Sequence, residues 1–109
     1  MKPGDIVLTR FTYSDFSGSK VRPALVLSSE KFNQETKLVI IAAISSRPVK
    51  NTYELLIENW ESSGLRCKSK VCISKLLTGN KGLLTKIGSL DKKNFKEAIS
   101  LFYSIFLQV

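Results

Sequence analysis

The sequence predicts a mainly β fold: a small, strongly bent antiparallel barrel closed by one C-terminal α-helix. Two patterns in the 109-residue chain carry this prediction. Short apolar runs separated by turn residues fill its first two thirds, and the tail changes to apolar residues spaced three and four apart. A chain of this length is expected to fold as one domain, over residues 1–109, with a single modest core.

The first three strands are expected at residues 6–12, 21–28 and 38–44. A loop rich in serine, aspartate and glycine, at 13–19, separates the first strand from the second. Residues 38–44 are apolar throughout, which is typical of a strand buried on both faces. These segments provide the central part of the predicted barrel.

Three further strands complete the predicted barrel. Residues 53–57 form the fourth, and after a loop at 58–68 the fifth begins where Val71 and Ile73 alternate with polar positions. Residues 81–88 predict a short turn followed by a sixth strand. Short strands joined by turns in this way are typical of a small antiparallel barrel.

The tail predicts an amphipathic helix, because its apolar residues recur on one helical face. These residues are Phe95, Ala98, Ile99, Phe102, Ile105, Phe106 and Val109. Asp91 is the expected N-cap, its carboxylate accepting from the N–H groups of the first turn. Lys92, Lys93 and Lys96 crowd that turn, where the helix dipole disfavours cations, and we expect them to be solvated.

The chain is strongly basic, with 17 Lys and Arg against 9 Asp and Glu and a net charge of +8. Nine of these cations and a single acid lie between residues 62 and 96. Such a surface attracts polyanions, namely nucleic acid, an acidic protein segment or an anionic membrane, although a merely solvated lysine-rich surface has the same composition. Binding to a membrane surface would need a basic amphipathic helix with a strongly apolar face and free ends, and the sequence predicts no such helix. We therefore expect no membrane partner.

The chain is expected to be cytoplasmic. Its first residues lack the apolar segment of a secretory signal, and no apolar run approaches the ~18 residues of a membrane span. In that compartment Cys67 and Cys72 are expected to be two free thiols, with Cys72 a small core residue. Histidine is absent, so we expect no structural zinc, no other metal site and no Cys-His or Ser-His catalytic pair.

Arg22 is the first candidate for a functional residue. It stands directly before Pro23 at the start of the predicted second strand, beside a hydroxyl-rich loop. Proline cannot donate to a sheet ladder and therefore lies at a strand start, an edge or a bulge. A cation held at such a place can bind an anion, although a structural ion pair with Asp5 or Asp15 explains it equally well from the residues alone.

Four segments together resemble the MazF/PemK toxins. They read GDIVL at 4–8, SGSKVRPALVLS at 17–28, AAISS at 42–46 and KIGSL at 86–90. Further agreement comes from Trp60, which is expected in the core or a dimer contact, from the Gly-Leu pair at 64–65 and from the Ser-Lys-Val segment at 69–71. The resemblance runs along essentially the whole chain, and the first two segments are the most specific.

The resemblance implies an SH3-like barrel of the CcdB/MazF/Kid type and the toxin of a type II toxin–antitoxin system. Such toxins are homodimeric mRNA interferases: endoribonucleases that cut single-stranded RNA through its ribose 2′-hydroxyl, without metal or other cofactor. The implied partners are the RNA substrate and a cognate antitoxin, with operator DNA bound only by the toxin–antitoxin complex. A basic surface suits both the RNA and an acidic antitoxin.

The resemblance also implies a catalytic role for Arg22 and Ser45. The planar guanidinium of Arg22 can meet two phosphate oxygens and stabilise the extra charge that develops during attack. Ser45 stands where the family commonly has threonine, and its hydroxyl can bind a phosphate oxygen or orient the 2′-hydroxyl. From the residues alone, Ser45 and Ser46 could instead simply end a strand by bonding their own backbone.

The remaining candidates are expected to bind RNA around this pair. They are Ser17, Gly18, Ser19, Lys20, Pro23, Ser46, Arg47, Lys70, Ser74 and Lys75. The stretch 17–20 is expected to border the RNA groove, although an ordinary hairpin tip has the same composition.

The sequence departs from the family after the Ser-Lys-Val segment. Many members carry an acidic or arginine residue where this chain has Cys72 and Ser74. The neighbouring Lys75 can supply a positive charge in their place, but it cannot supply a carboxylate. The departure favours an alternative, a degenerate and non-catalytic module that binds antitoxin or DNA on the same barrel. A third alternative is a gyrase-poisoning toxin, which has the same barrel and inserts an aromatic C-terminal tail into its target. In this chain the last residues, 102–109, instead belong to the apolar face of the predicted helix, which argues against that alternative.

Overall fold

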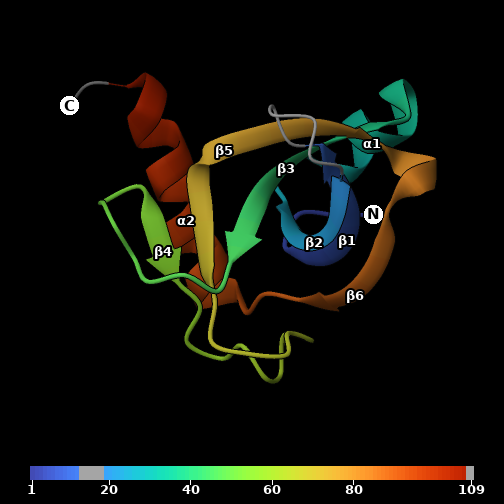
Figure 1. Ribbon diagram of the computed structural model, residues 1–109. Helices are drawn as coiled ribbons and strands as arrows, with labels where there is room; N and C mark the ends of the chain where they lie inside the picture. The colour runs from blue at the N-terminus through green and yellow to red at the C-terminus, as the bar shows by residue number, and fades with distance from the viewer. Residues whose placement is uncertain (13–18, 108–109) are drawn as a thin grey trace.

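Six strands of one antiparallel sheet form the body of the protein (Figure 1). The computed structural model describes residues 1–12 and 19–107. In chain order the elements are β1 Asp5–Thr12, β2 Ser19–Val26, α1 Glu30–Thr36, β3 Leu38–Ser45, β4 Glu54–Leu56, β5 Lys70–Asn80, the 3₁₀ turn η1 Lys81–Leu83, β6 Thr85–Ser89 and α2 Lys92–Phe106. The sheet order β4-β5-β3-β2-β1-β6 and the C-terminal helix confirm the predicted fold class.

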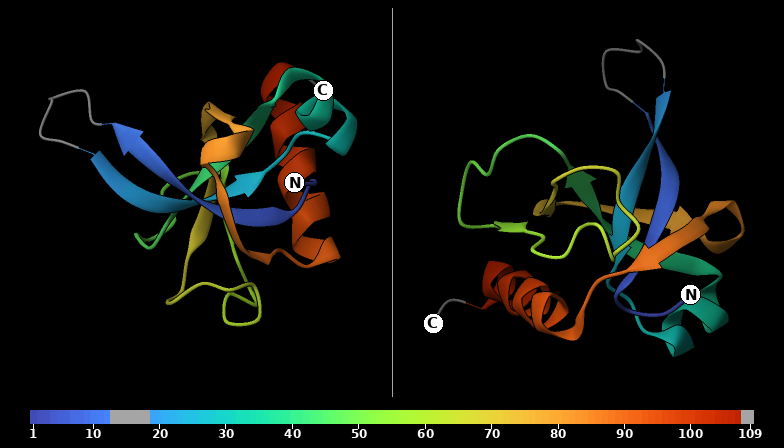
Figure 2. Two further views of the ribbon diagram at one scale, coloured as in Figure 1. Left: turned by 90° about the vertical axis from the view of Figure 1, so that its right-hand side faces the viewer. Right: turned by 90° about the horizontal axis from the view of Figure 1, so that it is seen from below.

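Pro23 lies where β2 changes from a central strand to an edge strand. β2 pairs with β1 along its whole length, but within the described chain it pairs with β3 only at residues 24–26. The remaining half of β2 continues with β1 as a two-stranded ribbon that projects from the body (Figure 2). Proline therefore needs no donor on its outer side. It lies at an edge, one of the positions expected for it, although β2 begins four residues earlier, at Ser19, and not next to it.

The two faces of the sheet carry separate apolar clusters, as the alternation of side chains along a strand requires. The larger cluster includes Leu25 of β2 and Ile44 of β3, and the helix α2 packs on it through Phe95 and Phe102. A smaller cluster on the opposite face includes Ala24, the residue next to Leu25. Each central strand is thus buried on both sides over part of its length.

The C-terminal helix begins as predicted. The Asp91 carboxylate accepts a 2.8 Å hydrogen bond from the N–H of Asn94, which is the expected N-cap. The buried part of the helix ends earlier than its apolar pattern, because Phe106 is 65% exposed and Ile105 40%. The final turn runs past the sheet and keeps an apolar face in contact with solvent, while Val109 lies outside the described residues.

The helix α1 was not among the predicted elements. It occupies seven residues after β2, which ends at Val26 rather than at Ser28. The Ser29 hydroxyl caps its first turn, and the buried Asn33 side chain donates to the carbonyl oxygens of Met1 and Ser28. With a single large apolar residue, Phe32, this helix has no periodic pattern that a sequence analysis could detect.

No helix in the described part of the chain is long and apolar enough to cross a membrane. The described cysteines are both unpaired, with Cys67 exposed and Cys72 buried, as predicted.

Candidate active site

A cleft of about 570 Å³ lies along the half of β2 that does not pair with β3. Its floor is apolar and includes Leu8 of β1, Ile44 of β3 and Ile87 of β6. Its polar residues are Arg22, Ser46, Arg66, Cys67 and Ser69. Two arginines and, among the described lining residues, no carboxylate make the cleft suitable for a ligand that is both anionic and partly apolar.

Arg22 is held in place by the β1–β2 ladder. It pairs with Thr9, it is exposed, and it borders the cleft between Val21 and Pro23. The residue before a proline favours extended geometry, which here continues the strand. Arg22 is therefore not a buried cation. Of the two carboxylates considered as its structural partners, Asp5 lies 3.2 Å from the ammonium of Lys86, and Asp15 lies outside the described residues.

The register places Arg22 and Ser45 on the same face of the sheet. Ala24 pairs with Ala43, and paired residues in an antiparallel sheet point to the same side. Arg22 lies two residues before Ala24 and Ser45 two residues after Ala43, so both share that side. The sequence-predicted pair is thus brought to one face, from two neighbouring strands. The adjacent residues Pro23 and Ile44, which line the cleft, belong to the other face.

The Ser45 hydroxyl already has a local partner. Its oxygen accepts a 3.2 Å hydrogen bond from the N–H of Arg47, in the turn that ends β3. This is the strand-ending role that the residues alone also allowed. A hydroxyl has one donor and two acceptor sites, so Ser45 retains a proton to donate, while its neighbour Ser46 lines the cleft.

The opposite wall of the cleft is formed by the segment 64–69 and is fixed by a contact between two glycines. Gly64 has φ +91°, and a Cβ on it would overlap the carbonyl oxygen of Ile87. A Cβ on Gly88 would overlap the carbonyl oxygen of Ser63. The segment can lie this close to β6 only because both residues lack a side chain, and this approach brings Arg66 to the cleft.

Lys70 has a different position from the one predicted. It was expected to be an RNA-binding cation, but its side chain is 4% exposed and its ammonium lies 2.7 Å from Glu54 Oε1. The ammonium also donates to the carbonyl oxygen of Pro48, at 2.7 Å. Because both partners satisfy the buried charge inside the chain, Lys70 is not a surface cation in this structure.

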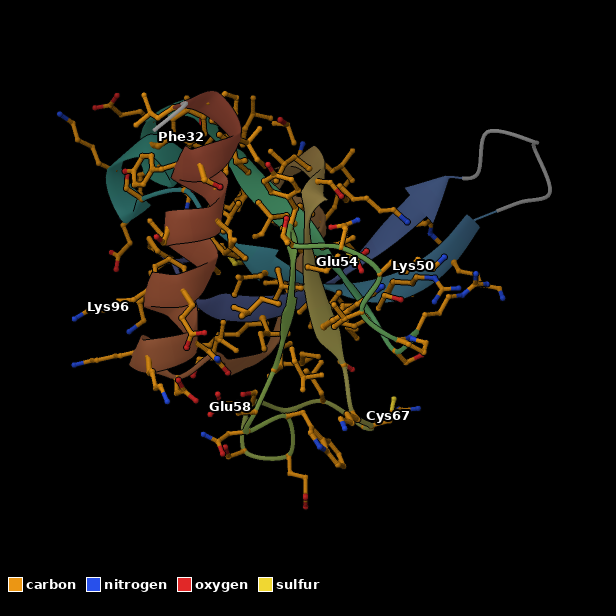
Figure 3. All side chains as sticks on the ribbon, turned by 90° about the vertical axis from the view of Figure 1, so that its left-hand side faces the viewer. Phe32, Lys50, Glu54, Glu58, Cys67 and Lys96 are labelled. Atoms are coloured by element: carbon orange, nitrogen blue, oxygen red, sulfur yellow. The ribbon has the colours of Figure 1, made fainter. Side chains whose placement is uncertain are left out.

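Glu54 brings a carboxylate to the face of the sheet that carries Arg22 and Ser45. It pairs with Cys72, which pairs with Ala43 in turn, so its side chain belongs to that face. Figure 3 shows Glu54 and Lys50 on the side of β4 and β5 that lies away from α2. The hydrogen bond from Lys70, followed by that from the Lys50 N–H, lowers the pKa of the Glu54 carboxyl.

The other predicted site residues are more scattered. Ser74 and Lys75 are exposed and lie at an irregularity of β5, between Cys72 and Leu76, where the strand bends (Figure 1). Lys20 and Arg47 are exposed, and Pro23 lines the cleft. Ser17 and Gly18 lie outside the described residues, and of Ser19 only the backbone pairing with Thr12 is described.

Arg66 and Glu54 were not among the predicted site residues. Arg66 had a detectable signal, since it belongs to the basic stretch between residues 62 and 96. Glu54 had no detectable sequence signal, because its partner Lys70 is 16 positions away and only the pairing of β4 with β5 brings the two together. Trp60 is half-buried against the larger apolar cluster, in agreement with the core position expected for it.

Residues 2–106 match the family described as PemK-like, MazF-like toxin of type II toxin–antitoxin systems. The chain belongs to this family. The match confirms the resemblance seen in the sequence and covers nearly the whole PemK/MazF-like chain. A comparison with curated proteins finds no match.

Solved structures agree with the fold of this PemK/MazF-like toxin. An endoribonuclease in complex with its cognate antitoxin, from a mycobacterial species, has a TM-score of 0.82 at 14% identity, over 97% of this chain and 94% of that one. A MazE–MazF complex from Deinococcus radiodurans has a TM-score of 0.80 at 19% identity, over 97% and 95%. The Mycobacterium tuberculosis toxin MazF-mt6 has a TM-score of 0.77 at 21% identity, over 94% and 95%.

Proposed function

We propose that this PemK/MazF-like toxin is a metal-independent endoribonuclease that cleaves single-stranded RNA by attack of a ribose 2′-hydroxyl on the adjacent phosphate. The observation that carries the proposal is the exposed Arg22 on the edge strand that borders the cleft, on the same sheet face as the Ser45 hydroxyl. Family membership supports the reaction class, since one similar structure is described as an endoribonuclease.

In this mechanism Arg22 stabilises charge. The attack adds negative charge to the phosphate oxygens, and the planar fork of arginine donates two parallel hydrogen bonds to such a group. Arginine keeps its proton at neutral pH, so Arg22 does not act as the base. Ser45 donates a hydrogen bond to a non-bridging phosphate oxygen or accepts one from the 2′-hydroxyl, which aligns the two groups. As the 2′-oxygen loses its proton and bonds to phosphorus, the P–O5′ bond breaks and the 5′-oxygen takes up a proton, which leaves a cyclic phosphate and a 5′-hydroxyl.

The proposed partners follow from the same surface. The net charge of +8 and the two arginines of the cleft favour single-stranded RNA and an acidic segment of a cognate antitoxin, which would compete for one site. Two of the similar structures are complexes of a toxin with its antitoxin. We further propose a cytoplasmic homodimer that binds operator DNA only in complex with the antitoxin.

Arg22→Ala tests the proposal. The variant is expected to lose about 10²–10³-fold in cleavage rate of a mixed-sequence RNA in the presence of chelator, because it lacks the group that meets the developing charge. It should unfold at the wild-type temperature and should no longer arrest growth. Lys31→Ala, which removes an exposed cation from α1, serves as the control and should cleave normally. A wild-type protein that leaves the RNA intact and does not slow growth would refute the enzyme.

The alternative is a non-catalytic module that binds antitoxin or DNA. It is favoured by Cys72 and Ser74 of β5, which stand where the resemblance leads one to expect an acidic or arginine residue. In that case wild-type and Arg22→Ala proteins have equal effects on cells, and both still bind the antitoxin tightly.

A further inference from the structure

The connection between β3 and β4, residues 46–53, is anchored by one buried ion pair. Lys70 Nζ and Glu54 Oε1 are 2.7 Å apart, and the two side chains are 4% and 7% exposed. Both belong to strands that frame the connection, since β4 begins at Glu54 and β5 at Lys70. Glu54 thus directly follows the last residue of the connection, and Lys70 is its partner from the neighbouring strand.

Each partner of the pair also binds the backbone of the connection. Lys70 Nζ donates to the carbonyl oxygen of Pro48, at 2.7 Å. The N–H of Lys50 donates to Glu54 Oε1, at 2.6 Å. Removing the pair would release both of these backbone anchors together.

The anchors hold the turn that contains the candidate hydroxyl. Ser45 pairs with Lys70 in the β3–β5 ladder, so Lys70 fixes Ser45 through its backbone and Pro48 through its ammonium. Between these two points Arg47 donates its N–H to the Ser45 hydroxyl, and Ser46 lines the cleft. The two serines are thus held on both sides by one residue.

Stability does not explain the presence of this pair. Taking two charges out of water costs about as much as their attraction returns, and apolar residues of similar size in their place are often neutral or stabilising. What apolar residues cannot supply is the donor for Pro48 and the acceptor for Lys50. The distinctive contribution of the pair is therefore geometric.

We propose that Lys70 and Glu54 are positioning residues that hold the turn at 45–48, and with it the Ser45 hydroxyl, in the orientation used for catalysis. The inference rests on the proposed endoribonuclease function. Neither residue touches the substrate in this role. Their effect reaches the reaction through Ser45 and Ser46.

The test is a double variant, Lys70→Met with Glu54→Met, which keeps the buried volume but removes both anchors. We expect its unfolding temperature to stay close to the wild-type value. The amides of Arg47 and Lys50 should exchange with solvent at least about tenfold faster, measured by NMR on the full chain. The kcat for RNA should fall about tenfold or more with KM little changed, since small misplacements of reacting groups have effects of this size.

Two controls separate positioning from general loosening. The amide of Tyr53, which donates to Asn51 Oδ1 in the same connection, should keep its wild-type exchange rate. The matched variant Lys93→Met with Glu58→Met removes an exposed pair that is 4.0 Å apart, and it should change neither exchange nor kcat. If this double variant does not fold, Lys70→Met with Glu54→Gln leaves no buried charge but still removes the donor to Pro48, and it is judged by the exchange rate of the Arg47 amide and by kcat.

Unchanged protection of Arg47 and Lys50, or faster exchange with unchanged kcat, would overturn the inference while leaving the proposed function intact. If the wild-type protein cleaves no RNA, the proposed function and the catalytic role both fail. Protection of Arg47 in the double variant would then refute the anchoring as well.

Discussion

The Glu54 carboxylate is kept charged by its neighbours. Its strongest interaction is the hydrogen bond from Lys70, and the backbone N–H of Lys50 adds a second. Both favour the charged form, and they lower the pKa of the carboxyl in the folded protein below its ordinary value. The protonation of this carboxyl therefore makes the anchoring of the connection between β3 and β4 dependent on pH.

This linkage predicts how stability depends on pH. Because the folded pKa of Glu54 is lowered, its contribution to the free energy of unfolding is complete above the ordinary carboxyl pKa. The contribution disappears as the pH falls through the lowered folded value. The difference in unfolding temperature between wild type and Glu54→Gln should accordingly be largest near neutral pH and close in acid.

Thermal unfolding from pH 7 to pH 3 measures this difference. Glu58→Gln, at an exposed carboxylate, provides the comparison and should track the wild type throughout. A gap between wild type and Glu54→Gln that stays constant over this range would contradict the interpretation.

At the scale of elements, the cleft depends on two departures from a regular sheet. In the described chain β2 pairs with β3 only from residue 24 onward, so the edge that carries Arg22 stays uncovered. The segment 64–69 approaches β6 through Gly64 and Gly88, which supplies the facing wall. Together they form the two sides of the cleft, with Arg22 on one and Arg66 on the other.

The second departure predicts the effect of Gly88→Ala. A Cβ there would overlap the Ser63 carbonyl oxygen, a backbone atom that cannot turn away, so one of the two segments must move. We expect a loss of about 1–3 kcal/mol in the free energy of unfolding, as for other overpacked sites. Denaturant unfolding measures the loss.

Gly82→Ala is the matched control. A Cβ on Gly82 would meet only the end of the Asn80 side chain, at 3.4 Å, so the Gly82→Ala variant should have nearly the wild-type free energy of unfolding. Equal unfolding midpoints for the two variants would show that the segment 64–69 adjusts at no cost.

The strands could be predicted more completely than the site. Apolar runs and turns located all six strands, and Asp91 marked the start of α2, because both signals are local in sequence. The seven-residue α1 was missed because capping and the buried Asn33, rather than periodicity, define it. The burial of Lys70 was missed because it depends on a strand pairing, not on neighbouring residues.

For the whole molecule, the net charge of +8 is the dominant property. Seventeen cations on a chain of 109 residues produce a positive field that extends beyond the cleft. Polyanions are attracted before any specific contact forms, and dissolved salt screens this attraction.

The charge predicts salt-sensitive binding of RNA. For single strands the logarithm of the affinity falls by about 0.7 per neutralised phosphate for each tenfold rise in salt. With about three phosphates engaged, the affinity should fall at least about tenfold between 50 and 200 mM salt. Fluorescence anisotropy with a 2′-methoxy RNA, which cannot be cleaved, measures this change. If the affinity did not depend on salt, we would conclude that RNA binds through the apolar floor of the cleft and not through its phosphates.

The contrast between the two cysteines has a practical consequence. Burial raises the pKa of the Cys72 thiol and hides it from reagents, whereas Cys67 is exposed at the cleft. A maleimide dye should therefore label the native toxin at one position without any cysteine having to be removed. The fluorescence of that dye would report, in real time, whatever enters or leaves the space beside Arg66.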